Sequence, residues 1–117
     1  MTIGGYRVHA VETGRFGLDG GAMFGVVPKV LWERSDPADH RNRIDMAARA
    51  LLLVGNGRVI LVDTGNGDKI PEKLREIYKI RTDGTTLRSS LEVLGIRPGD
   101  VTDVILTHLH FDHAGGA

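Results

Sequence analysis

The sequence contains no cysteine, few aromatic residues and no net charge. Without cysteine, its 117 residues form no disulfide and offer no thiolate, so a bound metal has to be held by His, Asp or Glu. Fifteen basic residues balance fifteen acidic ones, which argues against a nucleic-acid partner. The sequence shows neither a signal-peptide pattern nor an apolar run of membrane-spanning length. It therefore favours a cytoplasmic protein with no membrane partner.

Glycine is abundant, with 16 residues, which fits a fold with many tight turns. Alternation of apolar and polar residues predicts a strand at 6–11, and a second short strand is expected at 15–18. The segment 22–43 has no clear period, so we expect a long loop that folds over another part of the protein.

The clearest element is a hairpin of residues 47–54 and 58–63. The pair Asn56-Gly57 separates two apolar runs, which is the strongest short-range signal for a hairpin. Both arms are almost continuously apolar, and this composition is typical of strands covered on both faces.

Two helices are expected after the hairpin. Asp68 is the expected N-cap of the first, with Pro71 in its first turn. The second is expected at 86–94, where leucines recur at helical spacing. A final strand at 101–107 then leads to the segment that carries most of the chemistry.

Three of the five histidines and one aspartate fall within residues 108–113. In an extended segment, His108 and His110 point to the same side, so both imidazoles can reach one metal ion. Asp112 and His113 come after the chain turns, and their different approach suits a second ion nearby. Imidazole and carboxylate ligands together suit zinc, iron or manganese.

The residues between and after these side chains have expected roles as well. Leu109 and Phe111 should point away from the histidines into apolar surroundings and anchor the loop. Gly115 and Gly116 allow backbone conformations that a side chain would obstruct.

The pattern His108-x-His110-x-Asp112-His113 resembles the signature of the metallo-β-lactamase superfamily. The resemblance implies an α/β (α+β) fold, the αββα sandwich. It implies that His108 and His110 hold one divalent ion and that Asp112 and His113 hold a second, with zinc as the expected metal. It further implies a catalytic role for Asp112. Asp63 matches the family's aspartate that orients a ligand histidine from behind the site.

Residues 18–32 resemble the N-terminal segment of the quorum-quenching lactonases, which open N-acyl homoserine lactones. This resemblance implies a hydrolase for a small-molecule ester or lactone, acting through a hydroxide held by two metal ions. Met23 and Phe24 would either line a pocket for the acyl chain or only pack the loop down.

The family's remaining ligands, two further histidines and a bridging aspartate, have no counterpart in this sequence. We therefore expect residues 1–117 to be the N-terminal portion of one domain, truncated after its first metal motif. Such a portion is expected to be inactive by itself and to self-associate through its exposed sheet.

Several alternatives stay open at this point. Another hydrolase of the same fold would share the metal motif: a thioesterase of the glyoxalase II kind, an arylesterase or an organophosphate hydrolase. A nuclease of the fold is less favoured, because the sequence has no basic stretch. A different class of protein is a non-catalytic chain that completes a second polypeptide by pairing along its sheet edge.

Overall fold

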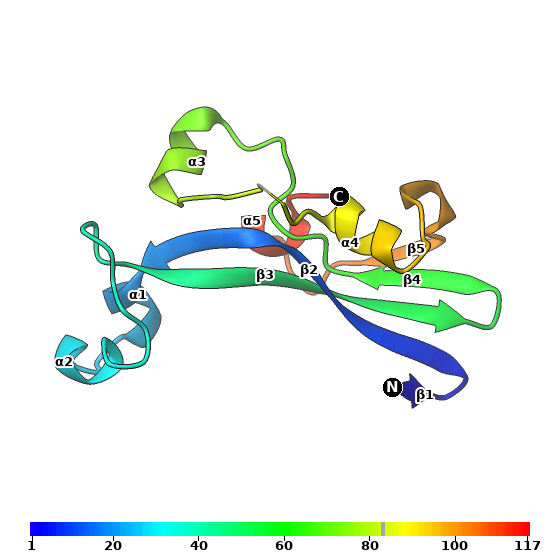
Figure 1. The fold of residues 1–117 in the computed structure, drawn as a ribbon, viewed down its shortest axis with the longest axis horizontal. Helices are drawn as coiled ribbons and strands as arrows, with labels where there is room; N and C mark the ends of the chain where they lie inside the picture. The colour runs from blue at the N-terminus through cyan, green and yellow to red at the C-terminus, as the bar shows by residue number, and fades with distance from the viewer. Residues whose placement is uncertain (83) are drawn as a thin grey trace.

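The computed structural model describes residues 1–82 and 84–117, and its framework is one five-stranded sheet of order β1-β2-β3-β4-β5 (Figure 1). The first four strands pair antiparallel, and the last pairs parallel with β4. The strands are β1 Thr2–Ile3, β2 Tyr6–Asp19, β3 Arg43–Gly55, β4 Arg58–Val62 and β5 Asp103–Ile105. This mixed sheet with its helices confirms the predicted α/β class as part of the αββα fold.

The helices are all short. They are α1 Gly20–Phe24, α2 Lys29–Trp32, α3 Glu72–Ile77, α4 Leu87–Val93 and α5 Phe111–Ala114, with a 3₁₀ turn at Pro98–Asp100. Within the described part of the chain, no helix has the length and apolar character needed to cross a membrane.

The predicted hairpin is confirmed as β3 and β4. Asn56 and Gly57 both have positive φ, 50° and 72°, as the favoured two-residue hairpin turn requires. Burial, however, alternates along the arm: Leu52 is fully buried, whereas Leu51 is 40% exposed. The described residues thus cover one face of this arm, as expected if the remainder of the fold supplies part of the cover, and coverage of both faces stays a prediction.

The two strands predicted near the N-terminus are one strand, β2. Its pairing with β3 continues through a register shift between Glu12 and Gly14. A bulge of this kind places two residues opposite one and interrupts the alternation of sides. The sequence pattern therefore breaks at the bulge, although the hydrogen-bonded ladder does not.

The segment predicted as a long loop contains α1 and α2. Helices of four and five residues are too short to show a hydrophobic period, so they could not be predicted from the sequence pattern. Trp32 is 4% exposed and covers Gly20 so closely that a Cβ on Gly20 would overlap the indole ring. The segment thus folds back on its own tryptophan.

The second predicted helix is confirmed as α4. The Thr86 hydroxyl caps it by accepting a hydrogen bond of 3.1 Å from the Ser89 N–H. The predicted start of α3 is wrong, because its N-cap is Pro71 and not Asp68. Ile70 precedes the proline, and a residue in that position is disfavoured in helical conformation, so the helix begins only afterwards.

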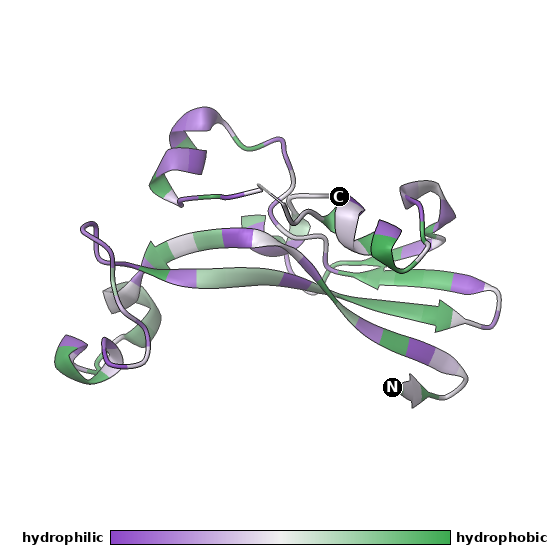
Figure 2. Ribbon diagram, viewed as in Figure 1, coloured by the Kyte–Doolittle hydropathy of each residue, from purple (hydrophilic) through white to green (hydrophobic). Residues whose placement is uncertain are grey.

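Two apolar clusters lie on one face of the sheet, since alternate residues of β3 supply both. The first cluster joins α4 to the sheet, and the second receives Phe111 of α5. Apolar residues run along β3 and β4 (Figure 2). The buried residues of the first cluster are Val11, Ala50, Leu52, Leu61 and Leu91, and those of the second cluster are Phe16, Ala48 and Ile80.

Candidate metal centre

The candidate ligands lie at the edge of the sheet where β4 and β5 both end. Because these strands are parallel, their carboxyl ends meet at one edge, and ligands of open α/β sheets bind at such edges. Asp63 follows β4 directly, and its N–H donates to the Ile105 carbonyl at 2.8 Å. The loop after β5 carries His108 and His110 to the same edge and ends in α5.

The three histidine rings of the segment lie together. The ring centroids of His108 and His110 are 4.6 Å apart, and those of His108 and His113 are 4.1 Å apart. The interplanar angles are 77° and 46°, so the rings meet edge-on or tilted rather than stacked. The assignment of these side chains as metal ligands stays a prediction.

The pair formed by Asp112 and His113 has the chemistry of a cation site. Asp112 Oδ2 lies 3.3 Å from His113 Nε2. The other ring nitrogen of His113, Nδ1, lies 2.8 Å from an Asp63 oxygen and therefore carries the proton of the neutral ring. Nε2 then faces a carboxylate with its lone pair, and a cation between the two groups would be attracted by both. Two ligands of one tetrahedral zinc are about 3.3 Å apart, so this pair fits.

The residues that the structure describes do not by themselves form a complete metal site. Over residues 1–82 and 84–117, no group of three or more His, Asp or Glu side chains is arranged to hold an ion. Zinc sites normally have three or four protein ligands per ion. The donors present therefore fit a divalent metal in kind, and within the described residues they do not form a complete set for one ion.

Asp63 is the polar centre beneath the histidines. It is 7% exposed, and it accepts hydrogen bonds from the Thr107 N–H at 2.8 Å and from His113 Nδ1 at 2.8 Å. Burial by itself would raise the pKa of Asp63, but the hydrogen bonds from His113 and Thr107 outweigh it, so the pKa lies below its usual value. Its φ of 63° is uncommon for a residue with a side chain, and such strain often accompanies functional sites. The role of orienting His113 stays a prediction.

The loop that follows Asp63 holds α5 through backbone contacts. The Thr64 N–H and hydroxyl both donate to the His113 carbonyl, at 2.7 and 2.9 Å. A Cβ on Gly115 would overlap the Asn66 carbonyl oxygen, so only glycine allows this approach. This contact was not predicted, although the closely spaced Gly65 and Gly67 were a signal for a close approach of two backbones.

Phe111 anchors α5 as predicted. Its ring lies 4.7 Å from Tyr78 and 5.7 Å from Phe16, between ring centroids. The matching prediction for Leu109 is wrong, because its side chain is 81% exposed. Strand-like alternation ends where the chain turns into α5, so Leu109 lies on the outside of the loop.

Met23 and Phe24 lie away from the histidines. Figure 1 shows α1 at the end of the β2–β3 ribbon and α5 near its middle. The Phe24 ring stacks on Trp32, with centroids 5.1 Å apart and an interplanar angle of 12°. Met23 is 46% exposed. This geometry favours the packing role for Phe24 and leaves the Met23 side chain free to meet a ligand.

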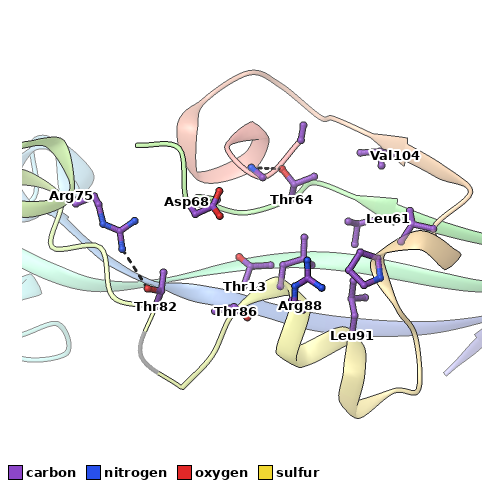
Figure 3. A pocket seen from close by; sticks show the side chains of 16 residues that line it. Thr13, Leu61, Thr64, Asp68, Arg75, Thr82, Thr86, Arg88, Leu91 and Val104 are labelled. Carbon is purple, nitrogen blue, oxygen red and sulfur yellow. Dashed lines mark hydrogen bonds between the residues drawn. The ribbon is translucent and has the colours of Figure 1, made fainter. Parts of the chain in front are cut away.

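A cavity of about 610 Å³ lies beside α4, and none of the four candidate ligands lines it (Figure 3). Thr64 lines it while its backbone holds α5, so the cavity lies behind the loop and not at the histidines. The Arg75 guanidinium reaches the Thr82 hydroxyl at 3.4 Å on its far side. The cavity is therefore distinct from the candidate metal centre.

The chain is similar in sequence and structure to several known proteins. A probable metal-dependent hydrolase from Staphylococcus aureus is 34% identical, with a TM-score of 0.86 over 99% of this chain and 42% of that chain. AidC, a dizinc quorum-quenching lactonase solved with N-hexanoyl-L-homoserine, is 27% identical, with a TM-score of 0.66 over 99% of this chain and 37% of that one. The lactamase-like protein aptB of Emericella nidulans is 45% identical over 65 residues, 55% of this chain and 16% of aptB.

The chain spans less than half the length of each of these relatives. The family model of the metallo-β-lactamase superfamily matches residues 43–117, from the start of β3 through the histidine segment. The match covers more than half of the chain and includes the loops that build the candidate centre. The protein belongs to the metallo-β-lactamase superfamily.

Proposed function

We propose that this sequence supplies the first half of a two-metal site in a hydrolase that opens lactones. The observation that carries the proposal is the grouping of His108, His110, Asp112 and His113 above the buried carboxylate of Asp63. Because the relatives are more than twice as long, the activity is proposed for these residues together with the remainder of such a fold. Two divalent ions, with zinc as the expected metal, are part of the proposal.

The residues of the centre would have separate tasks. When bound, the ions supply positive charge that polarises a carbonyl and lowers the pKa of a water. His108 and His110 would hold one ion, and Asp112 and His113 the other. Asp112 would also take up a proton from the attacking water and pass it to the ring oxygen, which leaves as an alkoxide when the carbon–oxygen bond breaks. The overall change is addition of water across the ester bond.

Two observations support a lactone over other esters. Solved lactonases align with 99% of this chain at 27% identity and a TM-score of 0.66. Residues 18–32 also resemble the N-terminal segment of that branch, and they include the exposed Met23. N-acyl homoserine lactones are therefore the first substrates to test.

The test measures ring opening by the zinc-loaded, full-length gene product on N-acyl homoserine lactones of several acyl lengths. A phosphotriester and a glutathione thioester serve as competing substrates. His110→Ala and Asp112→Ala should reduce turnover to the background, because each removes a proposed ligand. His40→Ala is the matched control, since His40 is exposed outside the histidine segment and should leave turnover unchanged.

Two results would overturn parts of the proposal. Strong activity on the phosphotriester or the thioester, with none on lactones, would replace the substrate class and keep the metal centre. Full lactone turnover in Asp112→Ala would remove Asp112 from the proposed mechanism.

A further inference from the structure

The Thr107 hydroxyl lies between the buried carboxylate of Asp63 and the imidazole of His108. Its Oγ1 is 3.0 Å from Asp63 Oδ1 and 2.9 Å from Asp63 Oδ2. On its other side it is 3.0 Å from His108 Nδ1. The backbone N–H of Thr107 donates to the same carboxylate at 2.8 Å, which fixes the position of the residue.

The protons in this chain of contacts can be assigned from the chemistry of the groups. An ionised carboxylate only accepts hydrogen bonds, and a hydroxyl has one proton to donate. Thr107 therefore donates its proton to Asp63 and can only accept from His108. The neutral His108 ring then carries its proton on Nδ1 and has its lone pair on Nε2, on the far side of the ring.

His113 reaches the same state directly. Its Nδ1 lies 2.8 Å from Asp63 Oδ2, so this nitrogen carries the proton and Nε2 has the lone pair. Asp63 thus contacts His113 directly and reaches His108 through the Thr107 hydroxyl. The two histidines are the first and last of the segment, and their ring centroids are 4.1 Å apart.

We propose that Thr107 is a positioning residue that transmits the influence of Asp63 to His108 and fixes the tautomer with a free Nε2. The inference rests on the proposed function only in taking His108 and His113 as metal ligands. Fixing the tautomer of a ligand histidine by a carboxylate or another hydrogen-bond partner commonly strengthens metal binding. Here one buried carboxylate would serve two ligands.

The experiment reads the tautomers by long-range ¹H–¹⁵N NMR of the metal-free, full-length gene product with ¹⁵N-labelled histidine. The spectra are recorded over a series of rising pH values, and the tautomers are read where the ¹⁵N chemical shifts no longer change with pH. His108→Gln and His113→Gln assign the signals. In the unmodified protein, both rings should carry the proton on Nδ1.

Thr107→Val removes the hydroxyl and keeps the shape of the side chain. His108 should then shift toward the Nε2–H tautomer while His113 keeps its proton on Nδ1, and zinc should bind about 10-fold more weakly. Thr107→Ser retains the hydroxyl and should retain the original spectrum. Thr102→Val is the matched control, because Thr102 stands at the other end of β5 and bonds to Val59. It should leave both rings unchanged.

An Nε2–H tautomer for His108 in the unmodified protein would overturn the inference, and this measurement needs no variant. Retention of the Nδ1 proton in a folded Thr107→Val protein would overturn it as well. Neither result depends on turnover. Failure of the lactone assay with the expected tautomers would therefore count against the proposed function and leave the role of Thr107 standing.

Discussion

The loop after β4 and the helical segment after β2 are held in place by opposite kinds of interaction. The first, residues 63–67, contains three buried polar residues, Asp63, Thr64 and Asn66, each at most 7% exposed. The second, residues 20–32, has one buried anchor, Trp32. Its exposed side chains are mainly apolar: Met23, Val26, Val27, Val30 and Leu31.

This difference indicates which region fixes geometry and which can adapt. The hydrogen bonds of Asp63 and Thr64 impose one arrangement on their partners, because any other arrangement leaves a buried polar group unpaired. The Asn66 side-chain amide is buried without a hydrogen-bond partner among the described residues, so it does not share in this network. An apolar segment resting on one aromatic ring has few such constraints. We therefore expect substitutions in residues 63–67 to act on stability and metal binding, and those in residues 20–32 to act on substrate preference.

The largest effect is expected for Asp63→Ala. The change leaves the Thr107 N–H and the His113 Nδ1–H without their acceptor, and unpaired buried donors are costly. The free energy of unfolding should fall by about 3 kcal/mol, measured by urea denaturation of the full-length gene product. Asp45→Ala is the control, because the Asp45 side chain is 61% exposed and its ion pairs contribute about 0.5 kcal/mol. Equal losses in the two variants would contradict the comparison.

A smaller effect is expected for Gly20→Ala in the helical segment. The new Cβ would overlap the indole of Trp32, and overpacking of this kind costs about 2 kcal/mol. Tryptophan fluorescence should report a displaced Trp32, while the histidine tautomers stay as they are. Gly99→Ala adds the same methyl group where nothing lies within 4 Å, and it should be silent. A change in zinc affinity with Gly20→Ala would show that the two regions are coupled.

The smallest effect on stability is expected for Met23→Ala, because the side chain is 46% exposed. The free energy of unfolding should change by no more than about 0.5 kcal/mol. If Met23 contacts the acyl chain, kcat/KM should fall several-fold for long-chain lactones and little for short ones. Val26→Ala serves as the control, since Val26 is 99% exposed. An identical acyl-length profile in both variants would assign Met23 to packing alone.

Local features were predicted well from the sequence. The hairpin followed from Asn56-Gly57, because the turn needs two residues with positive φ. The position of α4 followed from the helical spacing of its leucines, and the structure adds the cap that the Thr86 hydroxyl provides. The anchoring of Phe111 followed from alternation of sides along the segment, the same argument that failed for Leu109. In each case the controlling interaction lies within a few residues or depends on one side chain.

Predictions failed where pairing with a distant segment decides the structure. The strand β2 is continuous because β3 pairs with it on both sides of the bulge, and the alternation in its own sequence shows only the interruption. Leu109 is exposed because the chain turns into α5, which the loop 63–67 holds through backbone contacts.

The identity of the donors and their spacing within six residues can be read from the amino-acid sequence, because ligand type and short spacing are local properties. The groups that lie beneath these donors depend on the pairing of the strands. Asp63 meets His113 across 50 residues of chain because β4 and β5 pair in parallel and end at the same edge. The Thr107 contact with Asp63, 44 residues away, arises from the same pairing. Side chains so distant in sequence become neighbours through the register of the sheet, and no local pattern encodes that register.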